Sequence, residues 1–180
     1  QGKTLSAAAT PSLRKSILII KSTAAAIQRI HDRGYLYLDA KPQNIFVIDG
    51  TTDIVQLFDF DSIVPIGGYD RSEKKNHYRI SYTEGFAALE QQMGKFKKLG
   101  VYTDVYGVGA LLFYLLFGRT PGAPDCETDA VYDFSAWRFA KEAFQDKIYW
   151  MLTEFFHGTL ANYHADRYQS MRFVISKLEE

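Results

Sequence analysis

The chain has 180 residues, of which 47% are hydrophobic and 15% aromatic, a composition that favours a folded domain with a sizeable core over a disordered chain. Its 21 basic and 21 acidic residues balance to zero net charge, so no overall positive field directs it to nucleic acid. A single cysteine, Cys126, excludes an internal disulfide, and the N-terminus lacks a secretion signal; together these features predict a cytoplasmic protein. The longest apolar run, residues 108–117, is too short to cross a bilayer.

The first clear element is an amphipathic helix. Thr10 provides a capping hydroxyl, Pro11 suits the first helical position, and Gly34 suits the left-handed residue that follows a helix end. Apolar residues recur every three or four positions between them: Leu13, Ile17, Ile20, Ala24, Ile27 and Ile30. Residues 1–9 show no period and predict a loop or short helix. We expect His31, near the helix end, to place a charge or hydrogen bond at the helix C-terminus.

The loop after this helix, residues 37–44, collects three groups that phosphoryl transfer requires. Asp39 offers a carboxylate that can orient a hydroxyl, Lys41 an ammonium that can neutralise phosphate, and Asn44 an amide oxygen that can hold a magnesium ion. Taken alone, Asp39 and Asn44 are also common turn-forming residues. The choice between the two interpretations depends on the motifs further along the chain.

Two short strands come next, at residues 45–48 and 54–58, joined by an Asp49-Gly50 turn signal. A hairpin returns the chain to its starting point, so the second strand would bring Asp59 close to Asn44. Oxygen atoms of both side chains could then reach one Mg²⁺. An Asp that simply ends an apolar strand is the alternative.

The remainder predicts a mostly helical arrangement. Residues 62–82 have no period and carry several basic side chains, which is typical of a surface loop. Thr103 and Asp104 are expected to cap a helix that runs to Phe117 and is apolar on every side, so it should be buried. Residues 119–134 predict a loop that follows the helix stop at Gly118.

One or two helices should follow Ser135 and end at Gly158. Periodic apolar residues then indicate a final helix: Met171, Val174, Ile175 and Leu178. The fold class is therefore α+β, mostly α-helical, with a small β-hairpin beside the candidate site.

Four segments in this order resemble the C-terminal lobe of Ser/Thr-type protein kinases. Residues 37–44 are similar to the catalytic loop His-Arg-Asp-x-Lys-x-x-Asn, and residues 59–61 to the Asp-Phe-Gly metal motif. Residues 83–90 resemble Thr-x-x-Tyr-x-Ala-Pro-Glu, and residues 104–109 the Asp-x-x-x-x-Gly start of the central helix. The chain departs from these patterns at five positions: Tyr37, Leu38, Asp61, Phe86 and Leu89.

The resemblance implies a role for each matched catalytic position. Asp39 would orient or deprotonate the substrate hydroxyl, and Lys41 would neutralise the γ-phosphate of ATP. Asn44 and Asp59 would hold Mg²⁺, which clamps the phosphates. Because Leu38 stands where many kinases carry an Arg, we expect activation not to depend on a phosphate held at that position.

The resemblance also implies three supporting contacts. Residues 59–90 would form the activation segment, in which Thr83 faces the catalytic Asp and the substrate. Glu90 would form a buried ion pair with Arg167, and Asp104 would accept hydrogen bonds from the catalytic-loop backbone.

The Gly-rich loop and strand Lys of the kinase N-lobe are not found in the sequence. We therefore expect residues 1–180 to be a single domain, the C-lobe of a longer kinase whose N-lobe is absent from this chain, and nearly inactive in isolation. Its partners would be ATP, a protein substrate and that N-lobe, with no nucleic acid and no membrane.

Two alternatives remain open. Residues 58–61 resemble the metal motif of small-molecule kinases of the aminoglycoside or choline type. The departures at Tyr37, Leu38, Asp61 and Leu89 are instead compatible with a pseudokinase that serves as a binding scaffold.

Overall fold

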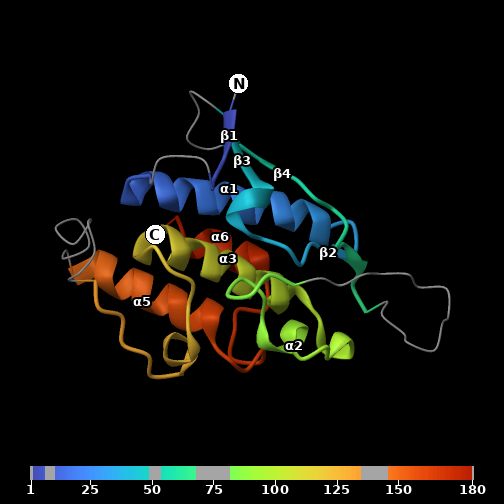
Figure 1. The fold of residues 1–180 in the computed structure, drawn as a ribbon. Helices are drawn as coiled ribbons and strands as arrows, with labels where there is room; N and C mark the ends of the chain where they lie inside the picture. Colours follow the sequence, from blue (N-terminus) through green and yellow to red (C-terminus); the bar gives the residue numbers. More distant parts are fainter. Residues whose placement is uncertain (1, 7–10, 49–53, 68–81, 135–145, 180) are drawn as a thin grey trace.

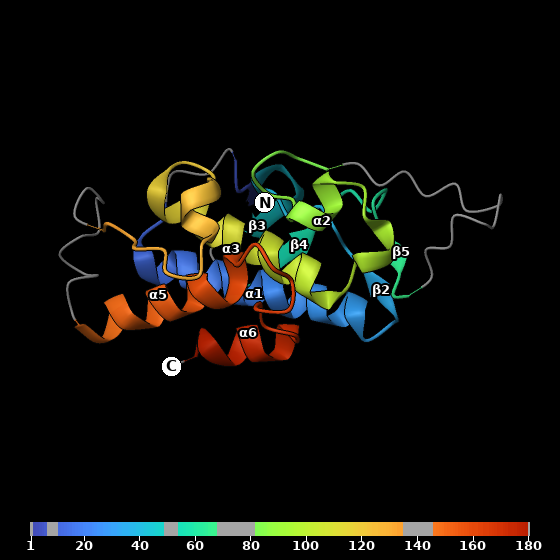
Figure 2. The ribbon, with the colours of Figure 1, turned by 90° about the horizontal axis from the view of Figure 1, so that it is seen from below.

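Helix α3 (Val101–Phe117) forms the centre of the fold. The structure, a computed structural model, describes residues 2–6, 11–48, 54–67, 82–134 and 146–179. Helices α1 (Leu13–His31) and α5 (Asp146–Leu160) pack against α3, and α6 (Met171–Lys177) packs against α1 (Figures 1 and 2). The predicted burial of α3 is confirmed, because Val105 to Phe113 are all buried. A helix that is apolar all round is stable only when other elements cover it.

Helix α1 begins later than the sequence predicts. Ser12 is its N-cap, and its hydroxyl accepts a hydrogen bond from the Lys15 amide at 3.3 Å. The prediction of Thr10 as cap is therefore wrong, and Thr10 itself lies outside the described residues. The predicted apolar stripe is confirmed, with Ile20 and Ile27 fully buried against the core. Gly34 follows the helix with φ of 82°, the left-handed conformation expected of it.

A three-stranded antiparallel sheet covers one side of α1 (Figure 1). Its strands are β1 (Gly2–Thr4), β3 (Ile45–Ile48) and β4 (Val55–Leu57), in the order β1-β3-β4. The β3–β4 hairpin is confirmed, with Ile45 opposite Leu57, although its Asp49-Gly50 turn lies outside the described residues. The prediction of a loop or short helix at residues 1–9 is wrong for β1, because pairing with β3 stabilises a strand too short to show a period.

Three further short elements, a strand pair and one helical turn, lie beside the candidate site. β2 (Tyr35–Leu36) pairs antiparallel with β5 (Val64–Pro65), and α2 (Leu89–Gln92) is a single turn. The sequence did not predict the β2–β5 pair, since two-residue strands carry no alternation. Buried side chains of the two strands and of Leu38, just after β2, form a small apolar cluster beside the main core: Leu36, Leu38 and Val64.

The start of α3 corrects a second capping prediction. The N-cap is Gly100, and Thr103 and Asp104 lie inside the first turn. The Thr103 hydroxyl accepts a hydrogen bond from the Gly100 amide at 3.1 Å. Asp104 is therefore not a cap, and its carboxylate is available for contacts elsewhere. Gly118, with φ of 70°, ends the helix as predicted.

The C-terminal part differs from the prediction at Gly158. Helix α5 continues through this residue to Leu160. The glycine allows the Tyr168 ring to pack closely against the α5 backbone, because a Cβ built on Gly158 would overlap that ring. The predicted loop at residues 119–134 contains a short 3-10 helix (Ala123–Cys126). The final predicted helix is present as α6. The start of the expected helix after Ser135 lies outside the described residues.

Within the described part of the chain, no helix has both the length and the apolar character needed to cross a membrane.

Candidate active site

The carboxylate of Asp39 is the centre of the candidate site. Its Oδ2 accepts hydrogen bonds from Lys41 Nζ at 2.7 Å and Asn44 Nδ2 at 2.8 Å, and its Oδ1 accepts one from the Thr83 hydroxyl at 3.2 Å. Lys41 Nζ also donates to the Thr83 hydroxyl at 3.3 Å. Three residues from two distant segments thus surround the buried carboxylate of Asp39. The Thr83 hydroxyl shows that an alcohol can sit within hydrogen-bonding distance of both Asp39 and Lys41.

The 3-10 turn η1 (Pro42–Asn44) places the Asn44 side chain beneath Asp39. Asn44 Nδ2 also donates to the Asp39 carbonyl at 3.1 Å, so both bonds use the amide nitrogen. The amide oxygen is the atom of this side chain that could bind a cation. The Asn44 carbonyl in turn accepts a hydrogen bond from the Phe58 amide at 2.9 Å, which brings the end of β4 to the loop.

Asp59 follows Phe58 in a left-handed conformation, with φ of 57°. Its side chain is exposed, and its Oδ1 accepts a weak hydrogen bond from the Asp61 amide at 3.3 Å. Left-handed backbone costs a non-glycine residue free energy, of order 1–3 kcal/mol, and such strain is frequently found at functional sites. The Asp59 carboxylate therefore remains accessible next to the catalytic loop.

The donor set fits a magnesium ion that is shared with phosphate. Asn44 and Asp59 offer an amide oxygen and a carboxylate, which are the hard oxygen ligands that Mg²⁺ prefers. Among the described residues, no group of three or more His, Cys, Asp or Glu side chains could hold a metal. Mg²⁺ is commonly bound through one or two protein oxygens together with substrate phosphates.

Tyr37 is a positioning residue that the sequence did not reveal. Its side chain is fully buried, and its hydroxyl donates to the Phe58 carbonyl at 2.5 Å, directly before Asp59. Burial, together with the nearby charge of Asp39, raises the pKa of the Tyr37 phenol, so it stays protonated and continues to donate. The available signal was a large aromatic residue two positions before the Asp of a tight loop.

Asp104 anchors the backbone of the same loop to α3. Its carboxylate accepts hydrogen bonds from the amides of Tyr37 at 2.9 Å and Leu38 at 2.7 Å. His31 Nε2 lies 2.7 Å from its Oδ2. The contact of His31 is thus with a side chain on α3, whereas the sequence suggested a role at the end of its own helix. A carboxylate with three such partners is well satisfied although it is buried.

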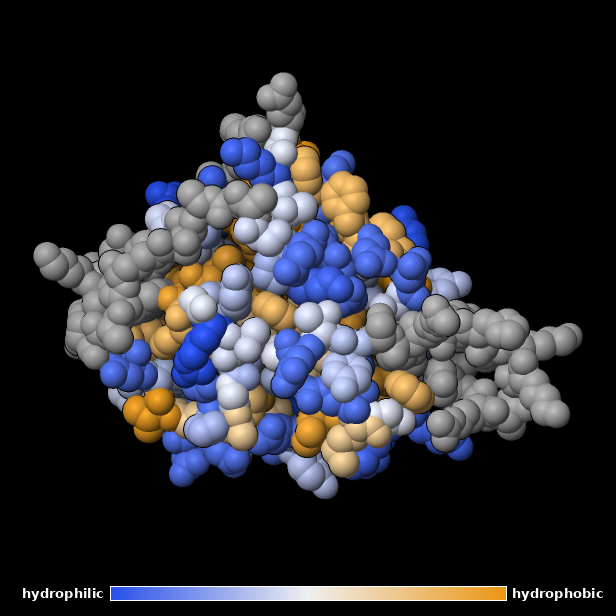
Figure 3. Space-filling model, viewed as in Figure 1, coloured by the Kyte–Doolittle hydropathy of each residue, from blue (hydrophilic) through white to orange (hydrophobic). Residues whose placement is uncertain are grey.

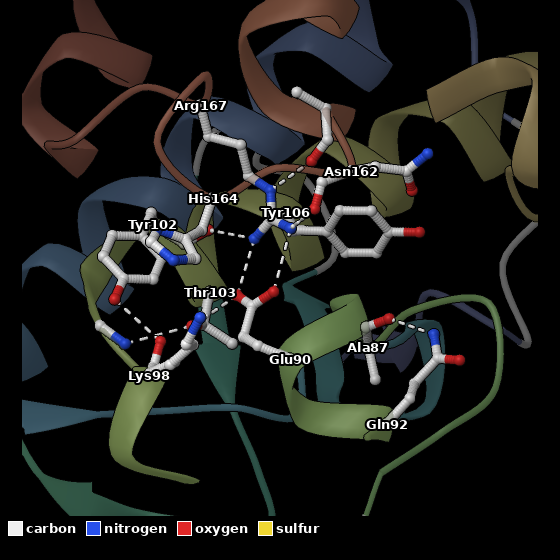
Figure 4. A network of polar contacts seen from close by, with 12 residues as sticks. Ala87, Glu90, Gln92, Lys98, Tyr102, Thr103, Tyr106, Asn162, His164 and Arg167 are labelled. Carbon is white, nitrogen blue, oxygen red and sulfur yellow. Dashed lines mark hydrogen bonds and ion pairs between the residues drawn. The ribbon is translucent and has the colours of Figure 1, made fainter. Parts of the chain in front are cut away.

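The end of the segment that carries Thr83 is held by a buried ion pair (Figure 4). Arg167 Nη1 and Nη2 donate to the two carboxylate oxygens of Glu90 at 2.8 Å and 3.0 Å, and both side chains are buried. The Thr103 hydroxyl donates to Glu90 at 3.0 Å, and Arg167 Nε donates to the Ala161 carbonyl at 2.6 Å. Two-point pairing of this kind fixes geometry as well as charge. The activation-segment end, α3 and the chain before α6 are thereby joined.

Leu38 lies in the apolar cluster with Leu36 and Val64. Its backbone has φ of 64°, and Gln91 Nε2 donates to its carbonyl at 2.9 Å. The position where many kinases carry a phosphate-binding Arg is thus occupied by a buried aliphatic side chain.

Comparison with known proteins identifies the family to which this arrangement belongs. The family model described as "Protein kinase domain" matches residues 3–173. The chain belongs to the protein kinase family. This match supports a protein kinase over the small-molecule kinase alternative.

Curated relatives are similar over part of their length. The chain is 29% identical over 136 residues to a smooth muscle myosin light chain kinase of Gallus gallus, covering 74% of this chain and 7% of the relative. It is 32% identical over 108 residues to a probable cAMP-dependent protein kinase catalytic subunit of Encephalitozoon cuniculi, covering 60% and 30%. This kinase chain therefore spans less than a third of either relative.

Solved kinase structures share the fold. The twitchin kinase region of C. elegans superimposes with a TM-score of 0.67 at 22% identity, covering 94% of this chain and 29% of that chain. The PknI kinase domain of Mycobacterium tuberculosis gives a TM-score of 0.65 at 20% identity, covering 99% and 62%. The predicted α+β, mostly helical kinase fold is confirmed.

Proposed function

We propose that this chain is the catalytic lobe of a Ser/Thr protein kinase that transfers the γ-phosphate of ATP to a protein hydroxyl. The observation that carries the proposal is the contact of Asp39 with Lys41, Asn44 and the Thr83 hydroxyl. The names of the myosin light chain and cAMP-dependent kinase relatives support Ser/Thr specificity.

The proposed roles follow from the contacts of each side chain. Asp39 orients the substrate hydroxyl and accepts its proton as the hydroxyl oxygen attacks the γ-phosphorus and ADP leaves. Lys41, held 2.7 Å from Asp39, places its ammonium beside the transferred group and offsets its negative charge. Asn44 and Asp59 would hold Mg²⁺, which when bound neutralises charge on the phosphates. Thr83, which now occupies the position next to Asp39, would line the entrance for the substrate hydroxyl.

We also propose that an N-lobe outside residues 1–180 completes the ATP site, so that the isolated chain is nearly inactive. The coverage of 62% of the PknI kinase domain is in keeping with this proposal. Phosphoryl transfer by residues 1–180 alone at the rate of the longer protein would contradict it.

Leu38 supports a proposal about regulation. Because position 38 carries a buried aliphatic side chain in place of an Arg, this position supplies no cation that could hold a phosphorylated activation segment. Phosphatase treatment of the active enzyme is expected to leave its rate unchanged. A phosphate-dependent rate that an activation-segment Ser or Thr to Ala substitution abolishes would overturn this proposal.

The deciding experiment measures transfer of labelled γ-phosphate from Mg·ATP, using the intact parent protein and its Asp39→Asn variant. Loss of the carboxylate should reduce protein labelling by about 10²–10⁴-fold, while the variant still unfolds cooperatively with only a small decrease in its unfolding midpoint. Asp32→Asn, a surface variant with the same chemical change, is the matched control and should retain activity. Labelling of small alcohols in place of protein would indicate a small-molecule kinase, and no turnover at all would favour the pseudokinase scaffold.

A further inference from the structure

A second site lies outside the catalytic loop, between α2 and the chain that precedes α6. The structure has a pocket of about 120 Å³ here. One wall comes from α2 and the 3-10 turn η2 (Phe96–Lys98), and the other from the loop at residues 162–164. The residues that give the pocket its character are Leu89, Met93, Lys95, Lys98, Tyr163 and His164.

The two walls are fixed relative to each other by Arg167 (Figure 4). This guanidinium pairs with Glu90 on α2 and also donates to the Asn162 carbonyl at 3.2 Å. The His164 ring stacks on Tyr102 with ring centroids 4.8 Å apart and on Tyr163 with centroids 5.9 Å apart. A pocket whose walls are already ordered loses little conformational entropy when a ligand binds.

The pocket combines apolar surface with unbalanced positive charge. Met93 and Tyr163 are 55% and 70% exposed, values that are high for side chains of this size. Neither Lys95 nor Lys98 forms an ion pair with any residue that the structure describes, and Glu90, the acidic residue of the lining, is neutralised by Arg167. Apolar and hydrophilic residues lie close together over α2 in the space-filling view (Figure 3). The pocket is therefore complementary to a ligand that combines negative charge with an apolar group.

The volume of the pocket limits the kind of ligand that it can hold. Sites for drug-sized molecules and cofactors have volumes of roughly 300–1,000 Å³. A cavity of about 150 Å³ is enough for a single benzene ring. The volume here thus suits one apolar side chain of a larger partner, with the lysines at the rim in contact with the residues that flank that side chain.

We propose that this pocket is a docking site for an acidic peptide segment that inserts one aliphatic side chain. The inserted group would contact Leu89, Met93 and the Tyr163 ring, while flanking carboxylates would pair with Lys95 and Lys98. Nucleic acid is disfavoured because the chain has zero net charge and only two lysines line the pocket. Docking here does not depend on the proposed catalytic function, since none of the catalytic-loop residues lines the pocket.

The test is binding without ATP, measured by fluorescence anisotropy on the intact protein. The probe is a labelled peptide in which a central Leu is flanked on both sides by Glu residues. Its controls are the same peptide with Ser in place of Leu, the same peptide with Lys in place of Glu, and a short single-stranded RNA. The charge-reversed variant Lys95→Glu/Lys98→Glu is compared with Lys97→Glu, because Lys97 lies on the same turn but does not line the pocket.

The Glu-Leu peptide should bind the unmodified protein, and the Lys95→Glu/Lys98→Glu variant should bind it about tenfold more weakly. Lys97→Glu should bind nearly normally, and the Ser and Lys peptides should bind weakly. Equal losses of peptide affinity in both variants would mean that the peptide is attracted by general positive charge and not by this pocket, which would overturn the proposal. So would tighter binding of the RNA, or equal binding of the Leu and Ser peptides. Because Asp39→Asn should bind the peptide normally, loss of catalysis and loss of docking are separable.

Discussion

The His31 imidazole and the Asp104 carboxylate lie 2.7 Å apart in the core although 73 positions separate them in the chain. Both side chains are almost completely buried. The same carboxylate holds the amides of Tyr37 and Leu38. One buried acid therefore connects the end of α1, the catalytic loop and the central helix.

Asp104→Ala should strongly destabilise the protein. The substitution leaves two backbone amides and the His31 ring nitrogen without their acceptor, and each unsatisfied buried group costs about 1–3 kcal/mol. We expect the free energy of unfolding in urea to fall by at least about 3 kcal/mol, with loss of activity. Asp104→Asn keeps one side-chain oxygen and should lose less. An Asp104→Ala variant with normal stability would show that water or a shifted loop replaces the carboxylate.

Glu90 and Arg167 should behave as a coupled pair. Either single Ala substitution leaves the other charge buried and should reduce the free energy of unfolding by about 3–5 kcal/mol. Arg167→Ala should be the more severe, because the carbonyls of Ala161 and Asn162 also lose a donor. The double variant should lose much less than the sum of the two, as a double-mutant cycle would measure. Additive losses would mean that the two charges contribute independently.

Tyr37→Phe should impair the proposed magnesium site more than it impairs the fold. Loss of one hydrogen bond, from its hydroxyl to the Phe58 carbonyl, should cost about 1 kcal/mol of stability. Since that carbonyl directly precedes Asp59, we expect the enzyme to need more Mg²⁺ for half-maximal activity. Tyr35→Phe, on an exposed side chain nearby, is the control. Unchanged Mg²⁺ dependence in Tyr37→Phe would leave the tyrosine with a packing role alone.

Two glycines of α3 allow a matched test of helix packing. A Cβ on Gly109 would lie 2.5 Å from Thr159 Cβ on α5, whereas one on Gly107 would lie 3.2 Å from Ala40 Cβ. Both Ala substitutions gain about 1 kcal/mol of helix propensity. At Gly109 the overlap should outweigh this gain, for a net loss of about 1–3 kcal/mol in thermal unfolding. Gly107→Ala should be clearly milder, and a reversed order would place the closest helix contact near Ala40.

The sequence predicted those parts of the fold that have a period or a strong turn signal. The apolar stripe of α1 and the apolar run of α3 each extend over many residues. A pattern of this length identifies a helix whatever packs against it. The β2–β5 pair and β1 were missed because strands of two or three residues show no alternation. The capping predictions at Thr10 and Asp104 were wrong because a nearby residue is the N-cap in each case: Ser12 for α1 and Gly100 for α3.

The site was predictable to the extent that its residues lie close in sequence or match a known pattern. The resemblance pointed to six residues that the structure places in two groups of contacting side chains. Asp39, Lys41, Asn44 and Thr83 form one group, and Glu90 and Arg167 form the other. Their roles stay predictions. His31 and Tyr37 were not recognised as partners of Asp104 and Phe58. Their contacts depend on how α1, α3 and the hairpin pack, which local sequence does not encode.

The attachment of the catalytic loop to α3 has a consequence for heat inactivation. Surface loops usually open locally at little free-energy cost, well before the core unfolds. Here the amides of Tyr37 and Leu38 are hydrogen-bonded to a carboxylate on the most buried helix, so the loop cannot detach without breaking core contacts. The loop should therefore keep its shape until the whole domain melts.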